Sequence, residues 1–147
     1  MRGRQIAVVA VSFAALFACS KPSETSSGPS PVSAEVRLQQ IPAADPQKFG
    51  QVRSGRVWQN PYLIVKPDGF WLLDASNNEE RPLKPDQVLS ALAALPDSAW
   101  PYGRVVAVQE IVSGNSDADR IALRKERAIL AGTLEGAKVL ISWTPSS

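Results

Sequence analysis

Two short apolar runs flank the tightest turn signal in the sequence. Tyr62–Lys66 and Phe70–Asp74 lie on either side of Pro67-Asp68-Gly69. Proline sets the backbone angle of the first turn residue, and glycine adopts the left-handed conformation that closes the turn. Apolar runs joined in this way are typical of a β-hairpin. The pattern therefore predicts a hairpin over residues 62–74.

The apolar residues that follow the hairpin have the spacing of a helix. After a polar loop at residues 77–80, Leu83-Lys84-Pro85-Asp86 predicts a helix start, because proline suits the first turn and an acid near the N-terminus favours the helix dipole. Four apolar residues then form one helical face: Val88, Leu89, Leu92 and Leu95. Pro96 is expected to end this helix.

The last third of the chain predicts a strand, a helix and a strand. The apolar residues Val105–Val108 run on to Ile111 and Val112 without clean alternation, which indicates a strand buried on both faces. A helix is expected from Asp117 to Glu135, ended by Gly136, and a closing strand at residues 139–143. The apolar stripe of this helix consists of Leu123, Leu130 and Leu134.

Residues 36–60 carry scattered prolines and glycines, so they predict an irregular lead-in. We expect one helical turn after Asp45-Pro46 and a short strand near Arg56–Trp58. The fold class is therefore α/β (α+β): a single sheet of about four strands in the order hairpin, helix, strand, helix, strand, with both helices on one face. The strand-helix-strand half should be a right-handed parallel crossover.

This order is similar to the periplasmic domain of the ExbD/TolR family of energy-transducing proteins, and Pro101-Tyr102-Gly103-Arg104-Val105-Val106 resembles a Tyr-Gly-basic-Val-Val run of that family. The resemblance implies a shared small α/β architecture. No functional residue is carried over from it.

The start of the chain predicts an export signal. Arg2 and Arg4 precede an apolar run, Ile6–Ala18, that is shorter than the roughly 20 residues of a membrane-spanning helix. The run ends in Leu16-Phe17-Ala18-Cys19, which resembles the signal of bacterial lipoproteins. The resemblance implies that residues 1–18 are removed and that Cys19 receives lipid. An ordinary secretory signal with a chance cysteine is the alternative.

Residues 19–35 are expected to be a lipidated cysteine and a Ser/Pro/Gly-rich tether, and residues 36–147 a single domain. A flexible tether of this length spans on the order of 20 Å, so the domain should stay close to the membrane. Ser20 follows the cysteine, whereas an aspartate there tends to retain Gram-negative lipoproteins at the inner membrane. By this resemblance we expect the outer membrane, with the domain facing the periplasm.

The composition excludes several kinds of binding and catalysis. The first 18 residues hold two of the 16 basic residues and no acid, so the remainder has 14 basic and 14 acidic residues. No basic stripe with interleaved aromatics is present, and nucleic acid is not an expected partner. There is no histidine and no cysteine besides Cys19, which excludes Ser-His-Asp and Cys-His catalysis and most zinc sites. No cofactor is expected.

The segment Asn115–Glu126 contains acids at positions resembling an EF-hand calcium loop, but Arg120 stands where the sharp turn needs glycine. Capping of a helix by Asp117 and Asp119 is the expected role, and a calcium site is the alternative.

Aromatic residues at turns provide candidate binding residues. Trp71, Trp100 and Tyr102 could line a groove for a glycan or peptide, with Trp71 and Trp100 expected to be the exposed members. Packing in the core is the alternative, since aromatic side chains bury large areas. Glycoside hydrolysis needs a pair of carboxylates as acid and base. The candidates for such a pair are Glu79, Glu80, Asp86 and Glu110. No motif supports that role.

The sequence thus predicts a lipid-anchored component of the cell envelope that is not an enzyme. Its expected partners are the membrane, through Cys19, and an envelope protein. A lipoprotein that binds a small ligand or metal ion is the alternative, and a carboxylate-dependent envelope hydrolase is a second one.

Overall fold

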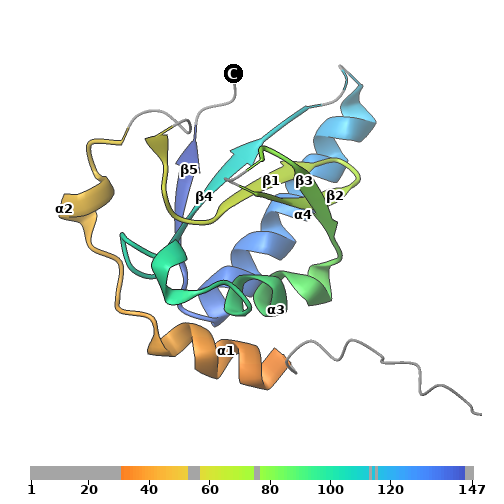
Figure 1. Cartoon of the computed structure of the whole chain (residues 1–147). Helices are drawn as coiled ribbons and strands as arrows, with labels where there is room; N and C mark the ends of the chain where they lie inside the picture. The colour runs from red at the N-terminus through yellow and green to blue at the C-terminus, as the bar shows by residue number, and fades with distance from the viewer. Residues whose placement is uncertain (1–30, 53–56, 75–76, 113, 115, 145–147) are drawn as a thin grey trace, which may run out of the picture.

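A computed structural model describes residues 31–52, 57–74, 77–112, 114 and 116–144 (Figure 1). Its elements, in chain order, are α1 (Pro31–Gln40), α2 (Pro46–Phe49), β1 (Tyr62–Lys66), β2 (Gly69–Leu73), β3 (Glu80–Leu83), the 3-10 turn η2 (Pro85–Gln87), α3 (Val88–Ala93), the 3-10 turn η3 (Asp97–Ala99), β4 (Val105–Glu110), α4 (Asp117–Gly136) and β5 (Leu140–Thr144). None of the helices in this described part has the length and apolar character that crossing a bilayer requires.

The strands form one mixed sheet in the order β3-β2-β1-β4-β5. The predicted hairpin is confirmed: β1 and β2 are antiparallel, with Val65 opposite Phe70 across the turn. The predicted parallel pairing is also confirmed, because β4 and β5 run parallel on either side of α4 in the chain. β4 in turn lies parallel to β1, which places it between two neighbours and explains its apolar sequence.

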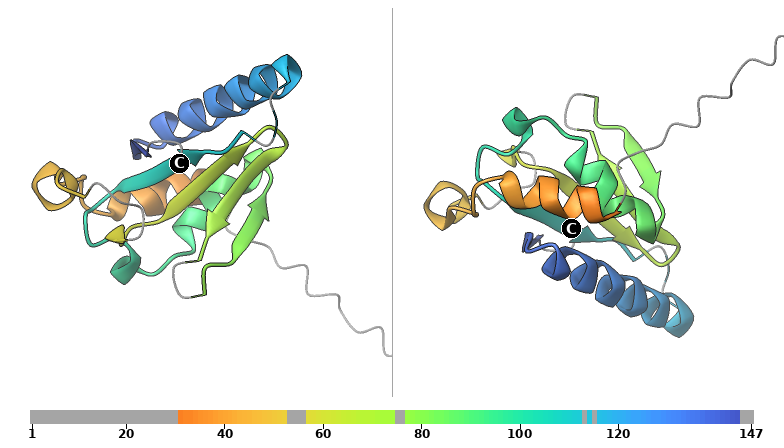
Figure 2. Two further views of the ribbon diagram at one scale, coloured as in Figure 1. Left: turned by 90° about the horizontal axis from the view of Figure 1, so that it is seen from above. Right: turned by 90° about the horizontal axis from the view of Figure 1, so that it is seen from below.

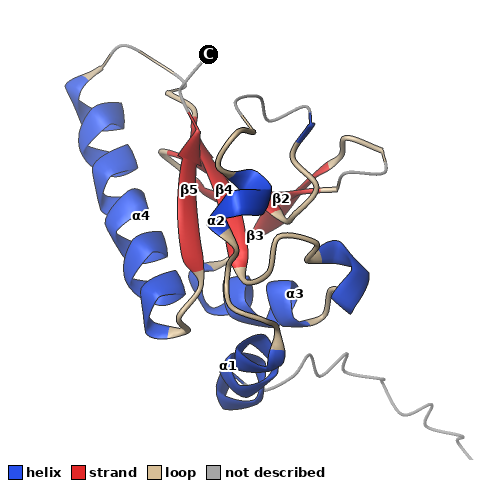
Figure 3. Cartoon of the chain, turned by 90° about the vertical axis from the view of Figure 1, so that its left-hand side faces the viewer, coloured by secondary structure: helices blue, strands red, loops and turns tan. Residues whose placement is uncertain are grey.

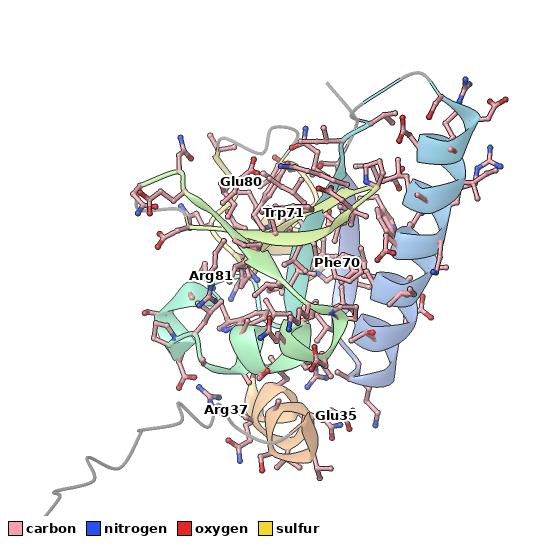
Figure 4. The ribbon with its side chains drawn as sticks, turned by 90° about the vertical axis from the view of Figure 1, so that its right-hand side faces the viewer. Glu35, Arg37, Phe70, Trp71, Glu80 and Arg81 are labelled. Carbon is pink, nitrogen blue, oxygen red and sulfur yellow. The ribbon has the colours of Figure 1, made fainter. Side chains whose placement is uncertain are left out.

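The main core lies between one face of the sheet and the helices α1, α3 and α4. Alternate residues of β1, β2 and β4 point into it: Leu63, Val65, Phe70, Leu72, Val106 and Val108. Figure 2 shows α1 alongside α3, while α4 runs separately along the sheet. Figure 4 shows Phe70 and Arg81 on the helix side of the β2–β3 ribbon and Trp71 and Glu80 on the opposite side.

The opposite face of the sheet is covered at one end by a small aromatic cluster. Trp58 and Tyr102 pack edge to face, with ring centroids 5.2 Å apart, and Phe49 of α2 packs on Trp58 at 5.9 Å. These rings cover Val105 and Ala107 of β4. Figure 4 shows Trp71 on this same face, on the side of the sheet away from α1, α3 and α4.

Three sequence predictions need correction. The sheet has five strands, because Glu80–Leu83 forms β3 where a loop and a helix start were expected. Residues 31–35 belong to α1 instead of the predicted tether, and Ala34 is fully buried, so the folded part begins before residue 36. Trp58 lies outside any strand, and Arg56 lies outside the described residues. The helical turn at Pro46 is confirmed, with Asp45 as its N-cap.

The end of α4 also differs from the prediction. Gly136 is the last helical residue, but the left-handed residue is Lys138, with φ of 58°. The Lys138 N–H donates to the Glu135 carbonyl at 2.9 Å, and the Val139 N–H donates to the Leu134 carbonyl at 2.9 Å. This is the Schellman arrangement, in which the buried Val139 packs into the same core as Leu134. Lysine thus occupies the position that usually favours glycine.

Candidate functional site

A cavity of about 690 Å³ lies at the end of the sheet where β1 begins, β2 ends and β3 begins. The connection between α3 and η3 closes its helix side. Its volume is in the range of sites for small molecules. The lining residues include six that are apolar or proline and six that are polar: Pro61, Leu72, Leu73, Pro82, Leu95 and Ala99, with Gln59, Asn60, Asp74, Glu79, Glu80 and Arg81.

Local structure at the β2–β3 turn places the polar residues together. The Asp74 N–H donates to the Glu79 carbonyl at 2.9 Å, and the Asn78 N–H donates to the Asp74 carbonyl at 2.9 Å. Asn78 has a positive φ of 59°, which asparagine tolerates better than most residues. The turn therefore brings Asp74 and Glu79 side by side at the mouth of the cavity.

The mouth of the cavity carries more negative than positive charge. Among the described lining residues, Asp74, Glu79 and Glu80 supply three carboxylates and Arg81 supplies one cation. Lys66 lies outside the lining and pairs with Glu80, with 2.5 Å between Nζ and Oε2. With an apolar floor and an acidic mouth, the cavity is suited to a ligand that has an apolar body and a positive charge.

Asn60 fixes the wall of the cavity on the β1 side. Only 4% of this residue is exposed, and its side-chain amide meets three backbone groups. Its Nδ2 donates to the carbonyls of Gly103 and Val105 at 2.7 and 2.8 Å, and its Oδ1 accepts from the Tyr102 N–H at 2.9 Å. Sequence reasoning missed this residue, because a single asparagine before a proline usually indicates a turn.

The reason for this contact is the proline that follows. Parallel pairing of Tyr62 with Ala107 gives the Ala107 N–H to the Pro61 carbonyl at 3.1 Å. Extended by one step, the ladder would place the amide of residue 61 against the Val105 carbonyl. Proline has no N–H, so the Asn60 side chain supplies the missing donor. The start of β1 is thereby held against β4.

The three aromatic residues predicted to bind do not come together. Trp71 lies on the face of the sheet opposite to the main core, and Lys66 Nζ lies over its ring at 4.4 Å from the centroid. Trp100 belongs to the main core and Tyr102 to the second cluster. The expectation that Trp100 is exposed is wrong, since it is 4% exposed; its turn position reveals nothing about burial. None of the three lines the cavity.

The candidate carboxylates divide between two regions. Glu79 and Glu80 line the cavity, whereas Asp86 lies in η2 and Glu110 pairs with Arg127 at 2.9 Å. In the EF-hand-like segment, Asn115 lies outside the described residues and the N-cap of α4 is Ser116, whose Oγ accepts from the Asp119 N–H at 3.0 Å. Among the described residues, no three His, Cys, Asp or Glu side chains are grouped so as to hold a metal ion.

No family model, no curated protein and no solved structure matches this chain. The resemblance to the ExbD/TolR family therefore stays a prediction. Cys19 and the signal-like run before it lie outside the described residues.

Proposed function

We propose that this chain is a lipid-anchored binding component of a bacterial cell envelope, non-catalytic and facing the periplasm. The observation that carries the proposal is the sequence Leu16-Phe17-Ala18-Cys19 at the end of a short apolar run. This pattern supplies the only cysteine of the chain, and a cysteine at that place is the acceptor expected for lipid.

The anchor accounts for how a small domain stays at the membrane. Each buried methylene of a lipid chain contributes about 0.8 kcal/mol, and two chains give a stable anchor where one does not. The first described helix begins at Pro31, so the tether proposed here comprises residues 20–30 and is shorter than the predicted one, which extended to residue 35. A short tether keeps the domain at high local concentration near membrane-bound partners.

Replacement of Cys19 tests the anchor. In cells labelled with a radioactive or alkyne-tagged palmitate, Cys19→Ser should abolish labelling and move the chain from the membrane to the soluble periplasmic fraction. Ser20→Ala is the matched control, and it should keep both label and membrane retention. Ser20→Asp should move the labelled chain from the outer to the inner membrane. Equal membrane retention of the Cys19→Ser chain would contradict the anchor.

A second candidate function is the binding of a small amphipathic cation, and the cavity at the end of β2 favours it. Benzyltrimethylammonium and phenylacetate are suitable probes, because they share a phenyl ring and carry opposite charges. We expect the cation to raise the Tm of the full chain at millimolar concentration and the anion to leave it unchanged. Glu79→Gln should weaken the effect of the cation. Equal shifts with both probes would reject this candidate.

A further inference from the structure

The two edges of the sheet differ in how open they are to another strand. β3 and β5 are the edge strands. Natural proteins protect edges with short strands, prolines and charged residues, because an open edge pairs with other chains. β3 has four residues, three of which are Glu80, Arg81 and Pro82. β5 has five residues, Leu140–Thr144, with neither a proline nor a charge among them.

Pro82 makes the outer edge of β3 a poor partner for another strand, as the alternation of its hydrogen bonds shows. The Asp74 N–H bonds to the Glu79 carbonyl, so the backbone groups of Glu79 face β2. Along an antiparallel ladder the direction alternates, and the groups of Glu80 and Pro82 therefore face outward. Pro82 has no N–H to offer, and an added strand would lose that bond.

Among the described residues, no strand pairs with the outer edge of β5. The Leu140 N–H donates to the Arg104 carbonyl at 3.0 Å, so Leu140 faces β4 with its backbone. By alternation, the backbone groups of Ile141 and Trp143 face away from the sheet. Large apolar side chains lie beside them: Leu140 is 46% exposed and Trp143 is 38% exposed. Figure 3 views the sheet from this edge, with β5 as the front strand and α4 to one side.

Arg127 of α4 contacts this edge, and two further arginines lie on the same side of the helix. The guanidinium carbon of Arg127 lies 4.3 Å from the centroid of a Trp143 ring, which fixes the side of α4 that faces β5. Arg120 lies seven residues before Arg127, and Arg124 lies three residues before it. At these spacings all three side chains lie along one side of α4. Arg120 pairs with Asp117 and Arg127 with Glu110, whereas Arg124 has no ion-pair partner among the described residues.

We propose that the β5 edge binds an extended, acidic segment of another protein as a sixth strand. Its backbone would bond to the outward groups of Ile141 and Trp143, and its carboxylates would lie along the side of α4 that carries Arg124. Strand addition of this kind gains affinity from main-chain hydrogen bonds and specificity from the flanking side chains. The inference does not depend on the lipid anchor.

Charge favours such a segment over a second copy of the chain. If two β5 strands paired about a twofold axis, their α4 helices would lie next to each other on the same face of the joined sheet. The arginine-bearing side of each helix would then face the same side of the other. Like charges so placed disfavour the pairing, whereas carboxylates of an acidic strand would be attracted.

The test uses two fluorescein-labelled peptides, Glu-Glu-Thr-Val-Thr-Val-Thr-Glu-Glu and the same sequence with every Glu replaced by Lys. Fluorescence anisotropy should show that the full chain, purified in mild detergent at low salt, binds the Glu peptide at least tenfold more tightly. The difference should shrink as salt is raised, because exposed charges are screened. Amide exchange at Ile141 and Trp143 should slow in the complex.

Two variants separate backbone pairing from charge. Trp143→Pro removes an outward N–H that the β4–β5 ladder does not use, and it should abolish binding, while Trp143→Phe should retain it. Arg124→Glu changes an exposed residue without an ion-pair partner among the described residues, so the fold should be kept, and it should remove the preference for the Glu peptide. Equal binding of both peptides, or binding unchanged in Trp143→Pro, would overturn the proposal. A dimer that protects Ile141 and Trp143 without peptide would also overturn it.

Discussion

Replacing Asn60 by alanine should remove the contact that holds the start of β1 to β4. Three backbone groups lose a partner: the carbonyls of Gly103 and Val105 and the N–H of Tyr102. The Gly103 carbonyl still accepts from the Val105 N–H at 2.8 Å. The Val105 carbonyl and the Tyr102 N–H lose the side chain that now bonds them in a buried region, where water is excluded.

The size of the effect follows from those two groups. An unpaired buried donor or acceptor costs about 1–3 kcal/mol, so the free energy of unfolding should fall by about 3 kcal/mol. For a domain of this size that loss lowers the Tm by roughly 10 °C. Asn60→Asp conserves shape but places a carboxylate against two carbonyl oxygens, so it should destabilise at least as much. Gln59→Ala, an exposed neighbour, should change stability by less than about 0.5 kcal/mol.

Urea unfolding followed by tryptophan fluorescence measures these differences. A lower midpoint with an unchanged m-value would show that the native state alone has lost stability. If Asn60→Ala stays within the range of Gln59→Ala, the Asn60 side chain does not replace the missing proline N–H, and the reasoning about the start of β1 fails.

Three further stability predictions can be checked by the same unfolding curves. Lys138→Gly should raise the free energy of unfolding by about 0.5–1 kcal/mol, because glycine adopts φ of 58° without steric cost, and a loss would contradict the Schellman assignment. Arg104→Met should lower the free energy of unfolding by about 2 kcal/mol, because the Arg104 guanidinium donates to the Leu38 carbonyl in α1 and to the carbonyls of Ile41 and Lys138, just after the ends of α1 and α4. An effect below about 0.5 kcal/mol would contradict this role of Arg104. Trp58→Phe should lower the free energy of unfolding by about 1 kcal/mol more than Trp100→Phe does. The reason is that Trp58 Nε1 donates to the Pro61 carbonyl at 3.2 Å, whereas Trp100 Nε1 has no partner among the described residues. Equal losses in the two variants would contradict this prediction.

Elements specified by neighbouring residues could be predicted from the sequence. The hairpin turn needs only Pro67, Asp68 and Gly69, and α4 repeats its apolar residues over a long stretch. The first four residues of β4, Val105–Val108, are apolar because the strand lies between β1 and β5 inside the sheet. In each case the physical cause acts within a few residues or produces a long uniform pattern.

Elements that depend on distant contacts were missed. β3 carries Glu80, Arg81 and Pro82, and only its pairing with β2 makes it a strand. α1 is short and half of its ten residues are polar, and the burial of Ala34 and Leu38 against α3 stabilises it. The same limit applies to the site: the cavity joins three separate segments, and the role of Asn60 appears only once β4 lies beside Pro61.

Intact mass spectrometry of the chain extracted from membranes tests the central claim most directly. The account predicts that the mature chain begins at Cys19 and carries diacylglycerol on its sulfur, with residues 1–18 absent. A chain that begins at any other residue, or one whose Cys19 thiol is free, would contradict the lipid-anchored function.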